Sequence, residues 1–185
     1  MPTAATPVII ALGANLPSEF GPPRAALGAA LERIAASGVA ITGRSPWYES
    51  APVPASDQPW YVNGVVTVET ALDPAELLEL LLATEAEMGR RRTVANAARF
   101  IDMDLIAYGD AVRRAPQQAP ELPHPRMETR AFVVLPLADL LPDWRHPVTG
   151  APVAALAADL PGDQTLRKMA DGPGLFGTEW AGKDA

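Results

Sequence analysis

The feature that most restricts the fold is the order in which strand-like and helix-like segments follow one another. Short β-branched or apolar runs predict strands, whereas apolar residues recurring every three or four positions predict helices. The sequence predicts a strand, a helix, two strands, a helix and a strand, then a short helix, at about 8–12, 23–38, 39–43, 61–70, 73–89, 100–108 and 132–141. This order favours an α+β sandwich, with helices packed on a mainly antiparallel sheet.

Local signals set several of the expected boundaries. Asp73 and Glu76 have the spacing of a capping box, and Pro74 between them suits the first turn of a helix. Gly89 is expected to end that helix, and Gly38 suits the end of the preceding one. Pro136 is expected to start the last short helix, because proline is tolerated in a first turn but not in a helix interior.

Length and composition narrow the class of protein. A chain of 185 residues with 48% apolar residues predicts one globular domain, over residues 1–160. Residues 161–185 contain five glycines and few apolar anchors, which predicts a loosely attached tail. The absence of cysteine excludes disulfides, thiolate metal sites and cysteine nucleophiles, and fits a reducing, cytoplasmic location. No apolar stretch is long enough to span a membrane.

The charge is unevenly distributed along the chain. The net charge of −7 argues against a general nucleic-acid binder. Residues 90–130 nevertheless carry eight arginines and five acidic residues, a net charge of +3, whereas the rest of the chain carries −10. Arginine presents a fixed fork of donors that fits phosphate or carboxylate oxygens, so a site for a small polyanion is one interpretation. A solvated charged face is the alternative.

The strongest local motif is the pair Asp102 and Asp104 in the predicted strand. Alternate side chains of a strand share a face, so both aspartates should face the same way, about 7 Å apart, together with Phe100, Ile106 and Tyr108. Two carboxylates this close are favoured when divalent cations lie beside them, and Mg²⁺ sites commonly combine one or two carboxylates with phosphate oxygens. The alternative is that both simply line a solvated face.

Three further groups of residues are candidates for binding or chemistry. His124 lies between two prolines, with Arg130 further along, and could donate to a phosphate or serve as a structural histidine. Tyr61 and Asn63 share a strand face and could stack on and pair with a flat heterocycle, or form an ordinary amphipathic strand. Glu85 falls on the apolar stripe of its helix and needs a partner, for which a nearby arginine is the natural candidate.

Together these segments resemble the 6-hydroxymethyl-7,8-dihydropterin pyrophosphokinase family of folate biosynthesis. The resemblance covers residues 8 to about 147, in the stretches ALGANLP (11–17), SPWYESAPV (45–53), DQPWYVNGVVTVET (57–70), EAEMGRRR (85–92), RFIDMDLIAYG (99–109) and LPHPRMETRAFVVLPL (122–137). It implies a ferredoxin-like α/β sandwich. It also implies transfer of diphosphate from ATP to the 6-hydroxymethyl oxygen, giving AMP and the pterin diphosphate.

The resemblance implies a role for each matching residue. Asp102 and Asp104 match the pair that holds two Mg²⁺ ions. The positions that handle the nucleotide and its transferring phosphates are matched by Glu85, Arg90, Arg92, Arg99, Leu105, His124 and Arg130. The pterin site is matched by Tyr61 and Phe132, which sandwich the ring, Asn63, which bonds its edge, and Ser50 and Val53, which line the pocket. Loops at about 50–60 and 90–98 correspond to segments that close over ATP.

The sequence also departs from the family pattern. Asn96-Ala97-Ala98 stands where the family usually has Trp-Gly-Pro, and Leu82 stands where glutamine is common. Two alternatives therefore stay open: a paralogue that binds pterin or nucleotide without transferring phosphate, and a ferredoxin-like protein-interaction domain. The partners expected are ATP and the dihydropterin, with neither nucleic acid nor membrane, and the expected state is a monomer.

Overall fold

The computed structural model describes residues 6–89 and 100–170. The elements alternate largely as the sequence predicts, and the expectation of an α+β sandwich with an antiparallel sheet is confirmed. Their bounds are β1 Val8–Ala14, α1 Pro23–Ala36, β2 Ala40–Arg44, β3 Tyr48–Ser50, β4 Tyr61–Glu69, α2 Pro74–Glu87, β5 Asp102–Tyr108, the 3₁₀ helix η1 Met127–Thr129, α3 Ala131–Leu140, α4 Val153–Ala158 and β6 Leu166–Lys168.

The sheet is built around two central strands. Its order is β5-β1-β4-β3-β6, with β2 also pairing with β4, and all these pairs are antiparallel. β1 lies between β4 and β5 along its whole length, so residues of three strands stand side by side on one face.

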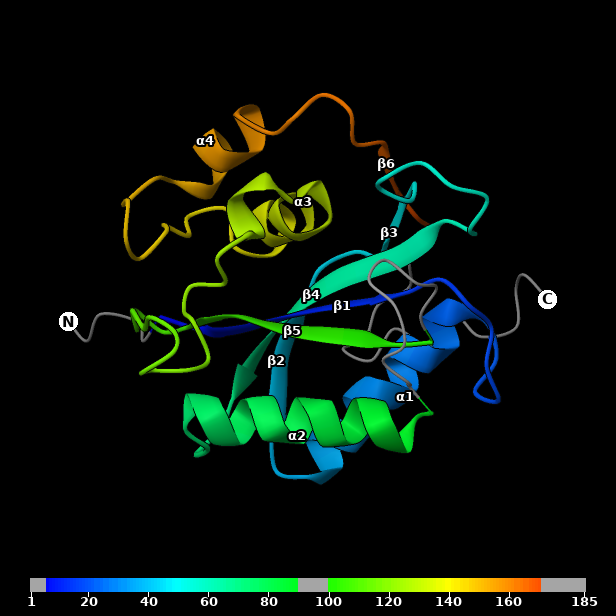
Figure 1. Cartoon of the computed structure of the whole chain (residues 1–185), viewed down its shortest axis with the longest axis horizontal. Helices are drawn as coiled ribbons and strands as arrows, with labels where there is room; N and C mark the ends of the chain where they lie inside the picture. The colour runs from blue at the N-terminus through cyan, green and yellow to red at the C-terminus, as the bar shows by residue number, and fades with distance from the viewer. Residues whose placement is uncertain (1–5, 90–99, 171–185) are drawn as a thin grey trace.

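Helices cover both faces of this sheet. Figure 1 shows α1 and α2 on one face and α3 and α4 on the other. The first interface, called here the α1/α2 core, includes Leu31, Leu77 and Met103, all nearly inaccessible to solvent. The second, called here the α3/α4 core, includes Val134 and Leu156. Burial of these apolar side chains is the main stabilising contribution on each face.

The predicted signals at the ends of α2 are confirmed. The Asp73 carboxylate accepts from the Glu76 amide at 2.9 Å, and the Glu76 carboxylate accepts from the Asp73 amide at 2.9 Å. Gly89 follows the helix with φ +90°, a left-handed conformation that favours glycine. Gly38 stands in the same conformation after α1.

The prediction that Pro136 starts the last helix is wrong. α3 begins at Ala131, and Pro136 lies inside it. Proline removes one backbone donor from a helix interior, yet Pro136 is buried, as are Val133 and Leu137 of the same helix. Tertiary packing of this very apolar segment therefore outweighs the local cost.

The predicted alternation of β5 fails in its second half. The pairing with β1 shifts between Ile9 and Ile10, so Ile106 is an extra residue in β5. Such a bulge inverts the alternation that follows. Ala107 consequently joins the α3/α4 core, whereas Tyr108 packs against the α1/α2 core and its hydroxyl donates to the Leu72 carbonyl at 2.6 Å. The prediction that Tyr108 shares a face with Asp102 is therefore wrong.

The described part of the expected tail is attached to the sheet. β6 pairs with β3 through Leu166, Arg167 and Lys168, and Figure 1 shows it at the edge beside β3. The Met169 amide donates to the Trp47 carbonyl at 2.9 Å. Residues 166–169 of the expected tail are therefore hydrogen-bonded to β3 and to the segment that precedes it. Across the described ranges, no helix has both the length and the apolar character needed to cross a bilayer.

Candidate active site

A cavity of about 610 Å³ opens beside the sheet, near the start of α3. Its wall combines four strands (β1, β3, β4 and β5), the segment that runs from η1 into α3, the loop after β3 and the segment before β6. The lining includes Gly13, Ser50, Val53, Gln58, Tyr61, Asn63, Asp102, Asp104, Arg126, Thr129, Arg130, Phe132, Asp163 and Gln164. Eight of these are predicted site residues, Ser50, Val53, Tyr61, Asn63, Asp102, Asp104, Arg130 and Phe132, so the fold brings them to one place.

Strand register explains how the two halves of the cavity meet. Gly13 of β1 pairs with Asn63 of β4 on one side and with Asp102 of β5 on the other. Residues directly opposite in neighbouring strands share a face, so the three positions form a row across the sheet. A Cβ on residue 13 would lie 2.8 Å from the Asn63 Oδ1 atom. Glycine at this position therefore leaves room for the Asn63 amide.

Asp102 and Asp104 line the same cavity, and both are half-buried. Met103 and Leu105, which alternate with them, are buried in the α1/α2 core. The predicted common face of the two aspartates is therefore confirmed. The described residues contain no cluster of three or more acidic or histidine side chains that could hold a metal. Two hard carboxylate ligands fit a Mg²⁺ site that takes its other ligands from phosphate oxygens and water.

Arg130 connects the acidic pair to the start of α3. Its Nη1 atom lies 3.3 Å from the Asp104 Oδ2 atom, and its guanidinium lies 5.5 Å from the centre of the Phe132 ring. One cation therefore contacts both an acidic ligand candidate and an aromatic wall of the cavity. A guanidinium in this position is poised to meet an anionic ligand beside the aspartates.

Hydrogen-bonded polar side chains line the opposite part of the cavity, among them Ser50, Gln58, Tyr61 and Asn63. The Asn63 Nδ2 atom donates to the Ser50 Oγ atom at 2.5 Å. The Tyr61 hydroxyl donates to the Gln58 Oε1 atom at 3.4 Å, and the Asn15 Nδ2 atom donates to the same oxygen at 3.1 Å. Oriented amides beside the aromatic rings of Tyr61 and Phe132 suit a flat ligand that carries donors and acceptors on its edge.

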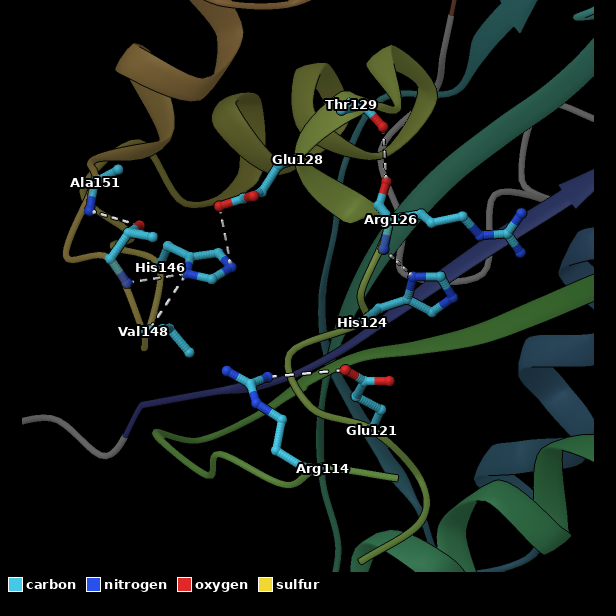
Figure 2. A network of polar contacts seen from close by, with 10 residues as sticks. Arg114, Glu121, His124, Arg126, Glu128, Thr129, His146, Val148 and Ala151 are labelled. Carbon is cyan, nitrogen blue, oxygen red and sulfur yellow. Dashed lines mark hydrogen bonds and ion pairs between the residues drawn. The ribbon is translucent and has the colours of Figure 1, made fainter. Parts of the chain in front are cut away.

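His124 is half-buried beside the cavity. Figure 2 shows its ring next to Arg126, whose backbone amide donates to the His124 Nδ1 atom at 3.2 Å. Because Nδ1 accepts a hydrogen bond, the neutral ring carries its proton on Nε2, which is therefore the atom able to donate to a ligand. Burial is the main cause that lowers the pKa of His124, opposed by the charge of Asp104 and reinforced by Arg130.

Glu85 and Leu105 lie behind the cavity wall. Glu85 is 2% exposed, and its Oε1 atom accepts from the Met103 amide at 2.7 Å, between the two aspartates in sequence. It therefore braces β5 from α2. The Leu105 side chain is buried in the α1/α2 core, so of this residue only the backbone could meet a nucleotide.

Some predicted residues lie outside the part of the chain that is described. These are Arg90, Arg92 and Arg99, the expected arginine partner of Glu85, and the Asn96-Ala97-Ala98 stretch. Other lining residues were not predicted. Gly13 and Gln58 fall in stretches that match the family, so the resemblance held a signal for them. Gln164 had no such signal, because it lies in the segment expected to be a tail.

Comparisons with known proteins identify the family of the chain. The family model described as 7,8-dihydro-6-hydroxymethylpterin-pyrophosphokinase (HPPK) matches residues 9–142. The chain is 39% identical over 149 residues to the 2-amino-4-hydroxy-6-hydroxymethyldihydropteridine pyrophosphokinase of Synechocystis sp., covering 80% of this chain and 73% of that protein. It is 41% identical over 140 residues to the protein of the same name from Pseudomonas aeruginosa, covering 76% and 83%.

A solved structure shows the same fold at low sequence identity. The crystal structure of wild-type HPPK-DHPS from Plasmodium falciparum superposes with a TM-score of 0.61 at 14% identity, covering 83% of this chain and 44% of that one. This likeness confirms the expected α/β sandwich with its antiparallel sheet. Since the family model spans well over half of the sequence, the chain belongs to the 7,8-dihydro-6-hydroxymethylpterin-pyrophosphokinase family.

Proposed function

We propose that the chain transfers the β,γ-diphosphoryl unit of ATP to the hydroxymethyl oxygen of 6-hydroxymethyl-7,8-dihydropterin. The hydroxymethyl oxygen bonds to the β-phosphorus and loses its proton to water. The bond from that phosphorus to the α,β-bridging oxygen breaks, and AMP leaves with the electron pair. Family membership supports this reaction. The proposal rests chiefly on one observation. A single cavity holds the paired carboxylates and Arg130 at one end and aromatic and amide side chains at the other.

Asp102 and Asp104 are the proposed ligands of two Mg²⁺ ions. Both carboxylates line the cavity, while Glu85 holds the Met103 amide between them. Divalent cations bound there would neutralise phosphate charge and orient the polyphosphate for in-line displacement. Glu85 contributes by fixing the backbone that presents the two ligands.

The cationic groups around this pair are proposed to bind the ATP phosphates. Arg130 already contacts Asp104. His124 accepts from the Arg126 amide at Nδ1, so its Nε2–H group is the donor available to a phosphate. Arg90, Arg92 and Arg99 are proposed to act with them on the strength of the family resemblance. Preorganised donors of this kind stabilise charge that develops in the transition state.

The dihydropterin is proposed to lie between Tyr61 and Phe132. Asn63, oriented by Ser50, would bond the edge of the ring, and Val53, which is 54% exposed, would cover the mouth of the cavity. A planar bicyclic ring buries both of its faces when it stacks between two aromatic rings, while the polar atoms on its edge keep hydrogen-bond partners.

A coupled assay for AMP tests the proposal. The purified chain is given ATP and 6-hydroxymethyl-7,8-dihydropterin, with Mg²⁺, with EDTA, and with EDTA followed by excess Mg²⁺. AMP should form only when both substrates and free Mg²⁺ are present. Tight binding of both substrates without AMP would instead identify a non-transferring paralogue, the alternative raised by Asn96-Ala97-Ala98.

The expected monomeric state and cytoplasmic location stay predictions. The cysteine-free sequence is compatible with a reducing compartment. Sedimentation of the purified chain would test the first prediction, and fractionation of the source cells the second.

A further inference from the structure

Gln164 is held between two backbone groups that flank Arg130. Its Oε1 atom accepts from the Ala131 amide at 2.9 Å, and its Nε2 atom donates to the Thr129 carbonyl at 2.8 Å. The two hydrogen bonds are made by one side-chain amide, so they fix the chain on both sides of Arg130 at once. Gln164 also lines the cavity.

The start of α3 needs such a partner. The first amides of a helix have no acceptor within the helix, and Arg130, the residue that precedes α3, makes no side-chain cap. Ala131 is buried, so an unpaired amide there would be costly. Gln164 supplies the missing acceptor from a segment more than thirty residues further along the chain.

The segment that carries Gln164 is itself fixed to the sheet. The Ala51 amide donates to the Thr165 carbonyl at 3.1 Å, and Ser50 pairs with Leu166 in the sheet. Gln164 therefore connects the strand edge that carries Ser50 with the helix start that carries Arg130 and Phe132. It lies outside residues 9–142, the range matched by the family model.

We propose that Gln164 is a positioning residue for the proposed reaction, because it sets the backbone that aims Arg130 at the polyphosphate and Phe132 at the pterin. This inference rests on the proposed function for its catalytic consequence. Its structural basis is the pair of hydrogen bonds across the junction of η1 and α3. Displacement of a reacting group by a fraction of an ångström to an ångström is enough to slow an enzyme measurably.

Gln164→Met is the most informative variant, since methionine keeps the length of the side chain and removes both hydrogen bonds. We expect kcat to fall and the KM for dihydropterin to rise, so that kcat/KM drops about tenfold, the equivalent of two ordinary hydrogen bonds. The melting temperature should fall by roughly 2–4 °C, because the buried Ala131 amide loses its acceptor at a cost of about 1 kcal/mol. Gln118→Met is the matched control, at an exposed glutamine that does not line the cavity.

Hydrogen exchange provides a second readout that needs no turnover. In Gln164→Met the amide of Ala131 should exchange faster than in the wild type, measured on a peptide covering residues 128–134. Gln164→Glu keeps an acceptor for that amide and should retain its protection. An inactive wild-type chain would refute the proposed function, whereas exchange at Ala131 would still test the positioning contact.

Wild-type exchange at Ala131 in Gln164→Met would overturn the inference. So would an active wild type whose kcat and KM are unchanged in Gln164→Met. A variant that loses melting temperature but keeps the wild-type kcat per folded molecule would also contradict it, because that result describes a purely structural contact.

Discussion

Single residues on three neighbouring strands set the chemistry of the cavity. Asp102, Gly13 and Asn63 occupy one row of the sheet, from the proposed metal ligands to the proposed pterin contact. Arg130 reaches Asp104 from the opposite wall at 3.3 Å. The proposed roles can therefore be tested one side chain at a time.

Asp102→Ala and Asp104→Ala should each abolish turnover while the fold survives. Loss of a metal ligand removes several kcal/mol of charge stabilisation, so kcat should fall by at least about a thousandfold. Both side chains are only half-buried, so circular dichroism should stay native. Asp143→Ala, at an exposed aspartate, is the control. Near-normal AMP formation in either cavity variant would refute the metal role.

Gly13→Ala should weaken pterin binding. The added Cβ would stand 2.8 Å from the Asn63 Oδ1 atom, too close for a normal contact, so the amide must rotate or shift. Since that amide bonds Ser50, the pocket edge would be disturbed. We expect the KM for dihydropterin to rise about tenfold with a smaller change for ATP, equivalent to roughly one hydrogen bond. Gly162→Ala is the control, because a Cβ there meets nothing. Equal KM values in the two variants would contradict this account of Gly13.

His124 should make the metal-free protein less stable as the pH falls. Its pKa in the folded state is lowered, chiefly by burial, so the unfolded chain binds the proton more readily. The stability is then complete above the ordinary histidine pKa of about 6.5 and is lost as the pH falls below it, towards the folded-state pKa. Melting temperatures of wild type and His124→Asn should diverge between about pH 7 and pH 5, the wild type falling more steeply. Parallel curves would show that His124 makes no such contribution.

At the scale of elements, α2 supports β5 from behind the cavity. Glu85 bonds the Met103 amide near the cavity, while Leu72, just before α2, accepts from Tyr108 at the other end of β5. The start of α2 therefore lies away from Asp102. Substitutions at the start of α2 should therefore affect stability alone, whereas substitutions at Glu85 should also affect the chemistry.

Asp73→Ala should cost stability without cost to catalysis. It removes the side-chain half of the capping box, worth about 1 kcal/mol, which lowers the melting temperature by about 2–4 °C in a chain of this size. The kcat should stay at the wild-type value. Glu79→Ala, at an exposed position of the same helix, serves as the comparison. A loss of kcat in Asp73→Ala, or stability equal to that of Glu79→Ala, would contradict this reading of α2.

Element prediction from sequence succeeded where the signal is local and failed where it is tertiary. The ends of α2 follow from Asp73, Glu76 and Gly89, all of which act within one turn. The bulge at Ile106 depends on how β1 pairs with β5, and Pro136 is tolerated because of its burial. β6 is three residues long and pairs with β3, so it is too short for a strand-like sequence pattern to predict it.

At the scale of the whole molecule, the sheet assembles a site from distant parts of the chain. The motifs of the sequence supplied Asp102, Asp104 and His124 as candidates, and the resemblance supplied Phe132 and Ser50. Neither the motifs nor the resemblance could predict the contact of Gln164 with Ala131. This contact forms only because the last part of the described chain returns to α3 in the complete fold. Spacing along a strand predicts which side chains share a face, whereas contacts between segments depend on the complete fold.

The identity and stoichiometry of the products distinguish diphosphoryl transfer from every other phosphoryl transfer. ATP, Mg²⁺ and 6-hydroxymethyl-7,8-dihydropterin are incubated with the chain, and nucleotides and pterins are quantified by chromatography with mass detection. A diphosphotransferase should form AMP and the pterin diphosphate in equal amounts, and both should be lost in Asp102→Ala. Formation of ADP with a pterin monophosphate, or AMP without a pterin diphosphate, would contradict it.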